Sequence, residues 1–182
     1  MRVLVNNAGI ARLRPLAQSS DEDSRSQIAL NIIALTRLTQ AILPAFLSQN
    51  AGTIINIASV LALHSLPISS VYSGTKGYVL NFTRGLQQEL SGTGIKVQLV
   101  LPASTATEIW DASGVPLSDL EQDTVMSAEN MVDAALAGLD QGEAITLPSV
   151  ADESLWINYD SARSALFAAT QTGKPAPRYK IG

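Results

Sequence analysis

The chain has 182 residues, of which 46% are hydrophobic and 15% are charged, so it can bury the core of one domain. Its net charge of −4 without a basic cluster argues against a nucleic acid or an anionic membrane as partner. The absence of cysteine excludes disulfides, a thiolate nucleophile and cysteine-ligated metals.

The N-terminus lacks the basic region and apolar run of a signal peptide. By inspection, no apolar stretch approaches the roughly 18 residues that a membrane helix needs. We therefore expect a soluble cytoplasmic protein with no membrane partner.

Short apolar runs along the chain predict four β-strands. Each run is nearly continuous, as is typical of strands that are covered on both faces. The runs are Arg2 to Val5, Thr53 to Ala58, Ile95 to Leu101 and Ala144 to Leu147.

Helical periodicity separates these runs. The first helix follows the acidic residues 21–23, which a helix N-terminus favours. Further helices are expected at about 71–90, 128–139 and 152–169, with Ser127 as an N-cap. In the first helix, spacings of three and four place on one face Ile28, Ile32, Leu35, Thr39, Ile42 and Phe46.

Strands that alternate with helices through short connections predict a doubly wound parallel α/β sheet. No repeat, linker or shift in composition divides the sequence, so we expect one domain over residues 1–182. Such sheets bind ligands beyond the carboxyl ends of their strands. Chemistry is therefore expected after Val5, after Ala58 and after Leu101.

Tyr72 and Lys76 are four residues apart, so they project from the same face of the second predicted helix. Alone, such a pair is more often an exposed lysine beside a half-buried tyrosine. Ser59, however, ends the preceding strand at the same edge of the sheet. A nearby ammonium lowers the pKa of a phenol, so the three groups could hold and protonate a carbonyl oxygen. They supply no hydride, which implies a cofactor.

Five stretches carry a family resemblance. In order and spacing they resemble the short-chain dehydrogenase/reductase family, and the likeness becomes loose after about Glu108. The stretches are NNAG at 6–9, NIIALTRLTQAILP from Asn31, INIAS ending at Ser59, YSGTK from Tyr72 and GIKVQLVLPASTATE from Gly94.

The resemblance implies a Rossmann-type fold and a catalytic set of Asn31, Ser59, Tyr72 and Lys76. Tyr72 would be the general acid/base and Ser59 would orient the carbonyl. Lys76 would lower the Tyr72 pKa and hold the nicotinamide ribose, and Asn31 would help to hold a water. From spacing alone, Asn31 is more simply a residue that satisfies a buried backbone group.

The resemblance also implies NAD or NADP as cofactor, with the choice left open. Ala103 stands where the family commonly has glycine, which would matter if a positive φ were required there. The turn at 6–9 could equally only tie strand ends together. The implied cofactor contacts are Asn6, Asn7, Ala8, Gly9, Tyr72, Lys76, Pro102, Ala103, Thr105 and Thr107.

Residues 109–126 match the family's variable substrate lid, and their apolar side chains suggest a partly hydrophobic carbonyl or alcohol substrate. Trp110 could equally belong to the core. His64, the only histidine, cannot form a metal site alone. Residues 171–182 are expected to be a C-terminal tail. The family suggests a dimer or tetramer through the helices that bear Asn31 and Tyr72.

The family's glycine-rich phosphate loop has no counterpart in these 182 residues, so the sequence matches the carboxyl-terminal portion of the fold, without its first strands. Arg2 to Val5 would then form an exposed apolar edge that could pair with another chain. Two hypotheses follow. One is an NAD(P)-dependent oxidoreductase, and the other is an inactive fragment with a structural or partner-binding role.

Overall fold

A computed structural model describes residues 2–180. The chain divides into two compact units, Met1–Ser149 and Val150–Gly182. Each unit is described below by itself, and the expectation of a single domain stays a prediction.

The first unit is built on a parallel sheet of four strands in the order β1-β2-β3-β6. β1 and β2 pair in register, with Val5 beside Ile55. The predicted strands and the doubly wound parallel α/β fold are confirmed. The strands are β1 (Val3–Asn6), β2 (Gly52–Ile57), β3 (Ile95–Val100) and β6 (Ile145–Thr146).

Two helices of this unit begin at a serine side chain that caps them. The Ser20 side chain accepts a hydrogen bond from the Asp23 amide, and Ser127 accepts one from the Asn130 amide, as predicted for Ser127. The helices are α1 (Asp21–Ile28), α2 (Leu35–Gln49), α3 (Ser70–Glu89) and α4 (Ala128–Gln141).

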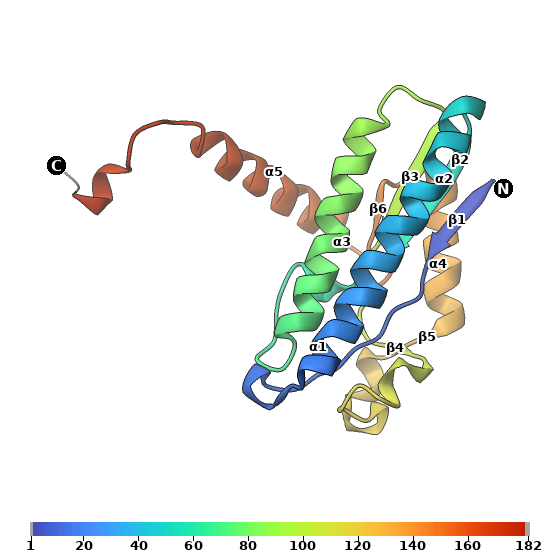
Figure 1. The fold of residues 1–182 in the computed structure, drawn as a ribbon, viewed down its shortest axis with the longest axis vertical. Helices are drawn as coiled ribbons and strands as arrows, with labels where there is room; N and C mark the ends of the chain where they lie inside the picture. The colour runs from blue at the N-terminus through green and yellow to red at the C-terminus, as the bar shows by residue number, and fades with distance from the viewer. Residues whose placement is uncertain (1, 181–182) are drawn as a thin grey trace. The chain divides into compact units, whose positions relative to one another are not determined.

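The helices cover both faces of the sheet. Ile54 packs with Phe46 and Leu86, which come from α2 and α3, the two helices that lie side by side in Figure 1. Its neighbour Ile55 points to the opposite face and packs with Ala135 of α4. The sheet is therefore the middle layer of three.

A π-helical segment, Ala29–Ala34, joins α1 to α2. Together they form a continuous helix in which Gln27, Asn31, Leu35 and Thr39 are buried at a spacing of four. Ile28 was predicted to share a face with Leu35 and Thr39 but is 42% exposed, whereas those two residues are buried.

This continuous helix, Asp21–Gln49, is long and apolar enough to span a membrane by length and composition. The prediction that no apolar stretch approaches this length is therefore wrong by this measure. The finding is weak evidence for a membrane span, because a core helix passes the same test. Here the helix packs against the sheet through Thr39 and Phe46.

β1 forms an edge of the described sheet. Val3 and Val5 are 49% and 52% exposed, as the apolar-edge prediction expected. An exposed strand edge presents unpaired backbone groups and can accept a further strand.

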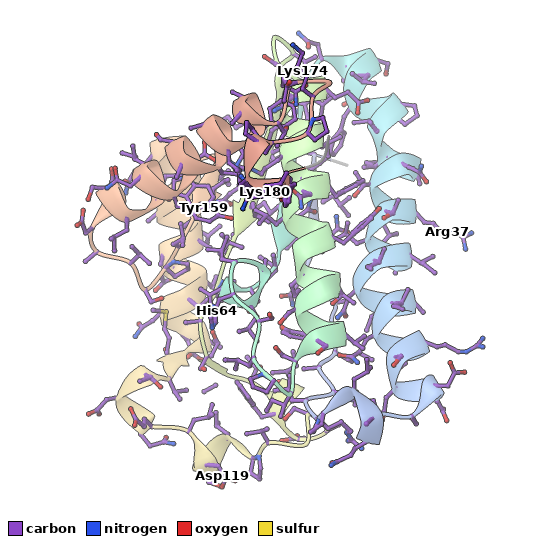
Figure 2. All side chains as sticks on the ribbon, turned by 90° about the vertical axis from the view of Figure 1, so that its left-hand side faces the viewer. Arg37, His64, Asp119, Tyr159, Lys174 and Lys180 are labelled. Atoms are coloured by element: carbon purple, nitrogen blue, oxygen red, sulfur yellow. The ribbon has the colours of Figure 1, made fainter. Side chains whose placement is uncertain are left out.

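Two short strands, β4 (Thr105–Ala106) and β5 (Met126–Ser127), pair in parallel beyond the end of β3. The pair closes the base of a loop of 3₁₀ turns at 107–125, which we call the lid. It corresponds to the segment predicted at 109–126. Figure 2 shows Asp119 at the outer tip of this loop.

The second unit contains α5 (Glu153–Ala169), which was predicted at 152–169. The Asp152 side chain caps this helix by accepting a hydrogen bond from the Ser154 amide. None of the residues of α5 is buried. A 3₁₀ turn at Pro177–Tyr179 follows in the tail.

Candidate active site

Helix α3 places Tyr72 and Lys76 on one buried face, one turn apart. Tyr72 is 9% exposed and Lys76 is 5% exposed. The Lys76 ammonium donates a hydrogen bond to the Ile57 carbonyl at 3.1 Å, and its nitrogen lies 5.6 Å from the centre of the Tyr72 ring. The lysine is therefore held against the carboxyl end of β2, beside the tyrosine.

Ser59 follows β2 and meets this pair. Its hydroxyl is hydrogen-bonded to Tyr72 and also accepts a hydrogen bond from the Leu61 amide at 3.1 Å. The neighbouring Val60 amide donates to the Pro102 carbonyl at 2.9 Å, which ties this turn to the segment after β3. The structure thus brings Ser59, Tyr72 and Lys76 together.

Burial controls the pKa values of both titratable groups. It raises the pKa of Tyr72 to about 12, although the hydrogen bond with Ser59 acts in the opposite direction. Burial also lowers the pKa of Lys76 to about 8. Burial and the hydrogen bond with Ser59 account for the shift of the Tyr72 pKa, and the predicted lowering of that pKa by Lys76 stays a prediction.

Asn31 holds both the loop after β1 and helix α3. Its amide exchanges two hydrogen bonds with the backbone of Ile10, each 2.9 Å long, and donates a third to the Thr75 hydroxyl at 3.0 Å. The simpler interpretation, that Asn31 satisfies buried backbone groups, is therefore confirmed. Its predicted role in holding a water stays a prediction.

The turn at 6–9 divides into a buried and an open part. Asn6 donates hydrogen bonds to Asn56 at 2.7 Å and to Thr39 at 3.1 Å, so it ties β1 to its neighbours. Asn7 and Ala8 are exposed. Asn6 therefore has the structural role that the sequence left open, while its neighbours are accessible at the carboxyl edge of the sheet.

Residues 102–107 follow β3 at the same carboxyl edge of the sheet. Ala103 does not adopt a positive φ, so the position does not require glycine. The Thr105 hydroxyl donates to the Ala103 carbonyl at 3.2 Å, whereas Thr107 begins the first 3₁₀ turn of the lid without capping it.

A cavity of about 360 Å³ opens beside this segment. Its walls are mainly apolar and come from the segment after β3, the lid and α4. They are formed by Pro102, Ala103, Thr105, Asp123, Thr124, Val125, Met126, Met131 and Ser149.

His64 takes no part in the cluster of Ser59, Tyr72 and Lys76, and Thr75 was not predicted as a neighbour of it. His64 is exposed on the loop that leads into α3 (Figure 2). Thr75 was missed, although it lies between Tyr72 and Lys76 in YSGTK, and its buried hydroxyl donates to the Tyr72 carbonyl. That position in the motif was the only signal in the sequence.

The site was tested for its fit to the nicotinamide half of a dinucleotide. Among the described residues, Lys76 Nζ has one hydrogen-bond acceptor, Ile57, which leaves donors for ribose hydroxyls. Gly9 keeps this space open, because a Cβ there would lie 3.4 Å from both Asn31 Oδ1 and Lys76 Nζ. The donor set fits, whereas residues 2–180 include no glycine-rich loop for the phosphates.

Comparison with known families decides the assignment. The sequence model described as short chain dehydrogenase matches residues 1–115. The chain belongs to the short-chain dehydrogenase/reductase family. The resemblance inferred from NNAG, YSGTK and the other stretches is therefore confirmed, and the homologues are oxidoreductases and dehydrogenases.

Solved structures support the fold over almost the whole chain. A short-chain dehydrogenase from Sphingobium yanoikuyae in complex with NADPH is 40% identical, with a TM-score of 0.92, and the match covers 98% of this chain and 69% of that one. The bulky-bulky ketone specific alcohol dehydrogenase from Comamonas testosteroni is 33% identical, with a TM-score of 0.85 and coverage of 98% and 67%.

Curated relatives are longer than this chain. L-2,3-butanediol dehydrogenase from Corynebacterium glutamicum is 36% identical over 119 residues, which cover 65% of this chain and 46% of the relative. An uncharacterised oxidoreductase from Staphylococcus haemolyticus is 32% identical over 148 residues, with coverage of 81% and 62%. The chain therefore spans about half the length of the curated relatives it matches.

Proposed function

We propose that this chain carries the catalytic residues of an NAD(P)-dependent oxidoreductase that interconverts a carbonyl and an alcohol. The observation that carries the proposal is the buried cluster of Ser59, Tyr72 and Lys76 at the carboxyl edge of the sheet. NAD(P)H, when bound, would supply the hydride, which no amino-acid side chain of the protein can donate.

In carbonyl reduction, the Ser59 hydroxyl donates a hydrogen bond to the substrate oxygen and so polarises the carbonyl. The Tyr72 phenol donates its proton to that oxygen as the carbonyl carbon accepts the hydride. Lys76 holds the nicotinamide ribose and stabilises the phenolate that remains. The phenolate then regains a proton from solvent.

The pKa of Tyr72 favours this direction of the reaction. With a pKa of about 12, the phenol is protonated at neutral pH and is ready to act as an acid. Alcohol oxidation needs a phenolate as base, and burial disfavours that charged form. At neutral pH the described residues therefore hold Tyr72 in the acid form that carbonyl reduction uses.

The substrate that we propose is a largely apolar ketone or aldehyde. Met126, Met131 and Val125 line the cavity, and Pro102 joins it to the turn that carries Ser59. The ketone-specific relative from Comamonas testosteroni is consistent with this class of substrate. Relatives bind NADPH, NADP or NAD, so either cofactor is consistent with the proposal.

The test is carbonyl reduction by the Tyr72→Phe variant in the protein as it occurs naturally. We expect kcat/KM to fall by about 10² to 10⁴, because Tyr72 is the proton donor. Tyr78→Phe is the matched control, since Tyr78 lies on the same helix and its hydroxyl contacts Thr36 at 2.8 Å. Unchanged activity in Tyr72→Phe would refute the assignment.

A second candidate function is a partner-binding role without catalysis. The exposed Val3 and Val5 on the edge strand favour it, because they offer a surface for another strand. Absence of carbonyl reduction in the unmodified protein, together with capture of a β-strand partner, would support this candidate.

We also propose a cytoplasmic homo-oligomer, with Ile33 and Leu38 on its contact face because both are exposed.

A further inference from the structure

A row of three polar side chains faces the loop after β1. Asp23, Gln27 and Asn31 are each four residues apart, and so lie about one helical turn from one another. Each contacts residues 10–14, which we call the strap. Asn31 bonds Ile10 in both directions, and the Gln27 side-chain oxygen accepts from the Arg12 amide at 3.0 Å.

Asp23, at one end of this row, holds the strap through its charge. Asp23 forms ion pairs with Arg12 at 3.4 Å and with Arg14 at 3.6 Å. Gln27 is 1% exposed, and its side-chain nitrogen donates to the Asp23 carbonyl at 3.2 Å. The amide of Gln27 therefore has a partner on each side, and the strap is fixed to the helix along its length.

The strap is joined to the lid on its other side. The Arg12 guanidinium donates to the Ala112 carbonyl at 3.0 Å, and the Leu13 amide donates to the Ser113 carbonyl at 2.6 Å. Gly114 adopts a φ of +92°, and a Cβ there would lie 3.0 Å from the Leu13 carbonyl oxygen. The lid therefore approaches the strap more closely than an ordinary side chain would allow.

Ser113 makes this attachment rigid. It is fully buried, and its hydroxyl can donate its single proton to the Val115 carbonyl at 2.8 Å or to the Trp110 carbonyl at 3.1 Å, while it accepts from the Val115 amide. The Trp110 indole in turn donates to the Thr105 carbonyl at 2.8 Å, and Thr105 lines the cavity. A continuous path of contacts thus runs from the helix, through the strap, to the cavity wall.

We propose that Arg12 and Gln27 are positioning residues for the lid: through the strap they fix Ala112–Gly114, and so set the place of Trp110 beside the cavity. The proposal rests on the proposed function only in taking this cavity as the substrate site. It assigns a role to two polar residues outside the cluster of Ser59, Tyr72 and Lys76.

Hydrogen exchange in the purified 182-residue chain tests the proposal. In Arg12→Ala, amides at 108–115 should exchange about tenfold faster, because the guanidinium bond to the lid and one of the two ion pairs between the strap and Asp23 are lost. Gln27→Met should act in the same direction. Arg25→Ala is the matched control, since Arg25 pairs with Asp21 on the same helix and is not seen to contact the lid.

A second readout is local to the lid. In a Trp156→Phe background, Trp110 reports on the lid alone, and Arg12→Ala should shift its emission to the red and increase its quenching by acrylamide. Arg12→Lys keeps a cation for Asp23 but lacks the fork that reaches Ala112, so it should loosen the lid as well. This variant carries the test if Arg12→Ala fails to fold.

Exchange at 108–115 that matches the Arg25→Ala control would overturn the proposal, and so would faster exchange spread equally over β2 and β3. Neither measurement requires turnover. A failure here is therefore distinguishable from a failure of the reductase assignment, which the Tyr72→Phe variant tests.

Discussion

Lys76 is the residue at which function and stability oppose each other most clearly. The site needs a cation beside Tyr72, but burial lowers the pKa of Lys76 from 10.5 to about 8. The folded state therefore binds this proton less tightly than the unfolded state. The resulting cost to folding is complete below pH 8 and is relieved as the pH rises from 8 towards 10.5.

We predict that Lys76→Met stabilises the chain at pH 7. The shift from 10.5 to about 8 corresponds to about 3 kcal/mol, and losing the hydrogen bond to Ile57 returns about 1 kcal/mol of it. The free energy of unfolding should rise by about 2 kcal/mol in urea titrations.

The pH dependence distinguishes this cause from better packing. The advantage of Lys76→Met should shrink between pH 8 and pH 10.5, where the wild-type lysine becomes neutral in the folded state. Lys96→Met, at an exposed lysine, serves as control and should change stability by no more than about 0.5 kcal/mol. A gain that stays constant up to pH 10.5 would contradict the argument.

At the scale of elements, a series of hydrogen-bonded polar side chains runs across the strands and joins two helices that cover the same face of the sheet. Asn56 is fully buried; it accepts from Asn6 at 2.7 Å and donates to Thr83 at 2.9 Å. Asn6 also donates to Thr39. The chain thus connects α2, β1, β2 and α3 just below the candidate site.

We predict that Asn56→Leu lowers the free energy of unfolding by about 2 to 4 kcal/mol. The substitution keeps the branched shape of the side chain, although it adds volume, and leaves buried polar atoms of Asn6 and Thr83 without this partner. Asn81→Leu on the exposed side of α3 is the control and should change stability by about 0.5 kcal/mol or less. If Asn56→Leu and Asn81→Leu lowered the free energy of unfolding in urea by the same amount, the buried hydrogen bonds of Asn56 would contribute no more to stability than the exposed position does.

The same elements show what local sequence can predict. The strands at β2 and β3 and the helix α3 were predicted because their apolar periodicity arises within one segment. The β4–β5 pair joins two-residue strands 21 positions apart, Thr105 with Met126, and no local pattern encodes such a pairing. The π-helical turn also escaped prediction, and it carries Asn31, whose partners Ile10 and Thr75 are distant in the sequence.

The candidate site shows a similar limit. Ser59, Tyr72 and Lys76 were predicted together because strand ends and helix faces follow from periodicity. The raised pKa of Tyr72 was not predicted, because the desolvation that causes it depends on all the groups that pack around the ring. Thr75 and the strap contacts of Gln27 depend on side chains that meet only in the fold.

At the scale of the whole molecule, the described residues would supply only the nicotinamide half of the proposed dinucleotide site. Lys76 and Gly9 border the space that we propose for a nicotinamide ribose. The 182 residues contain no glycine-rich phosphate loop, and the carboxyl edge beside β1 ends at exposed Asn7 and Ala8. The phosphates of a dinucleotide would therefore gain few contacts from these residues.

We predict that the purified 182-residue chain binds NADPH with a Kd above about 0.1 mM, which corresponds to about −5.5 kcal/mol or weaker. Reduced nicotinamide mononucleotide should bind within about tenfold of NADPH, because both would use the same ribose contacts. Fluorescence titration of both ligands measures this directly, with Lys76→Met as the variant that removes the ribose contact. Micromolar binding of NADPH, with turnover of a ketone by this chain alone, would show that it forms a complete site without a glycine-rich loop.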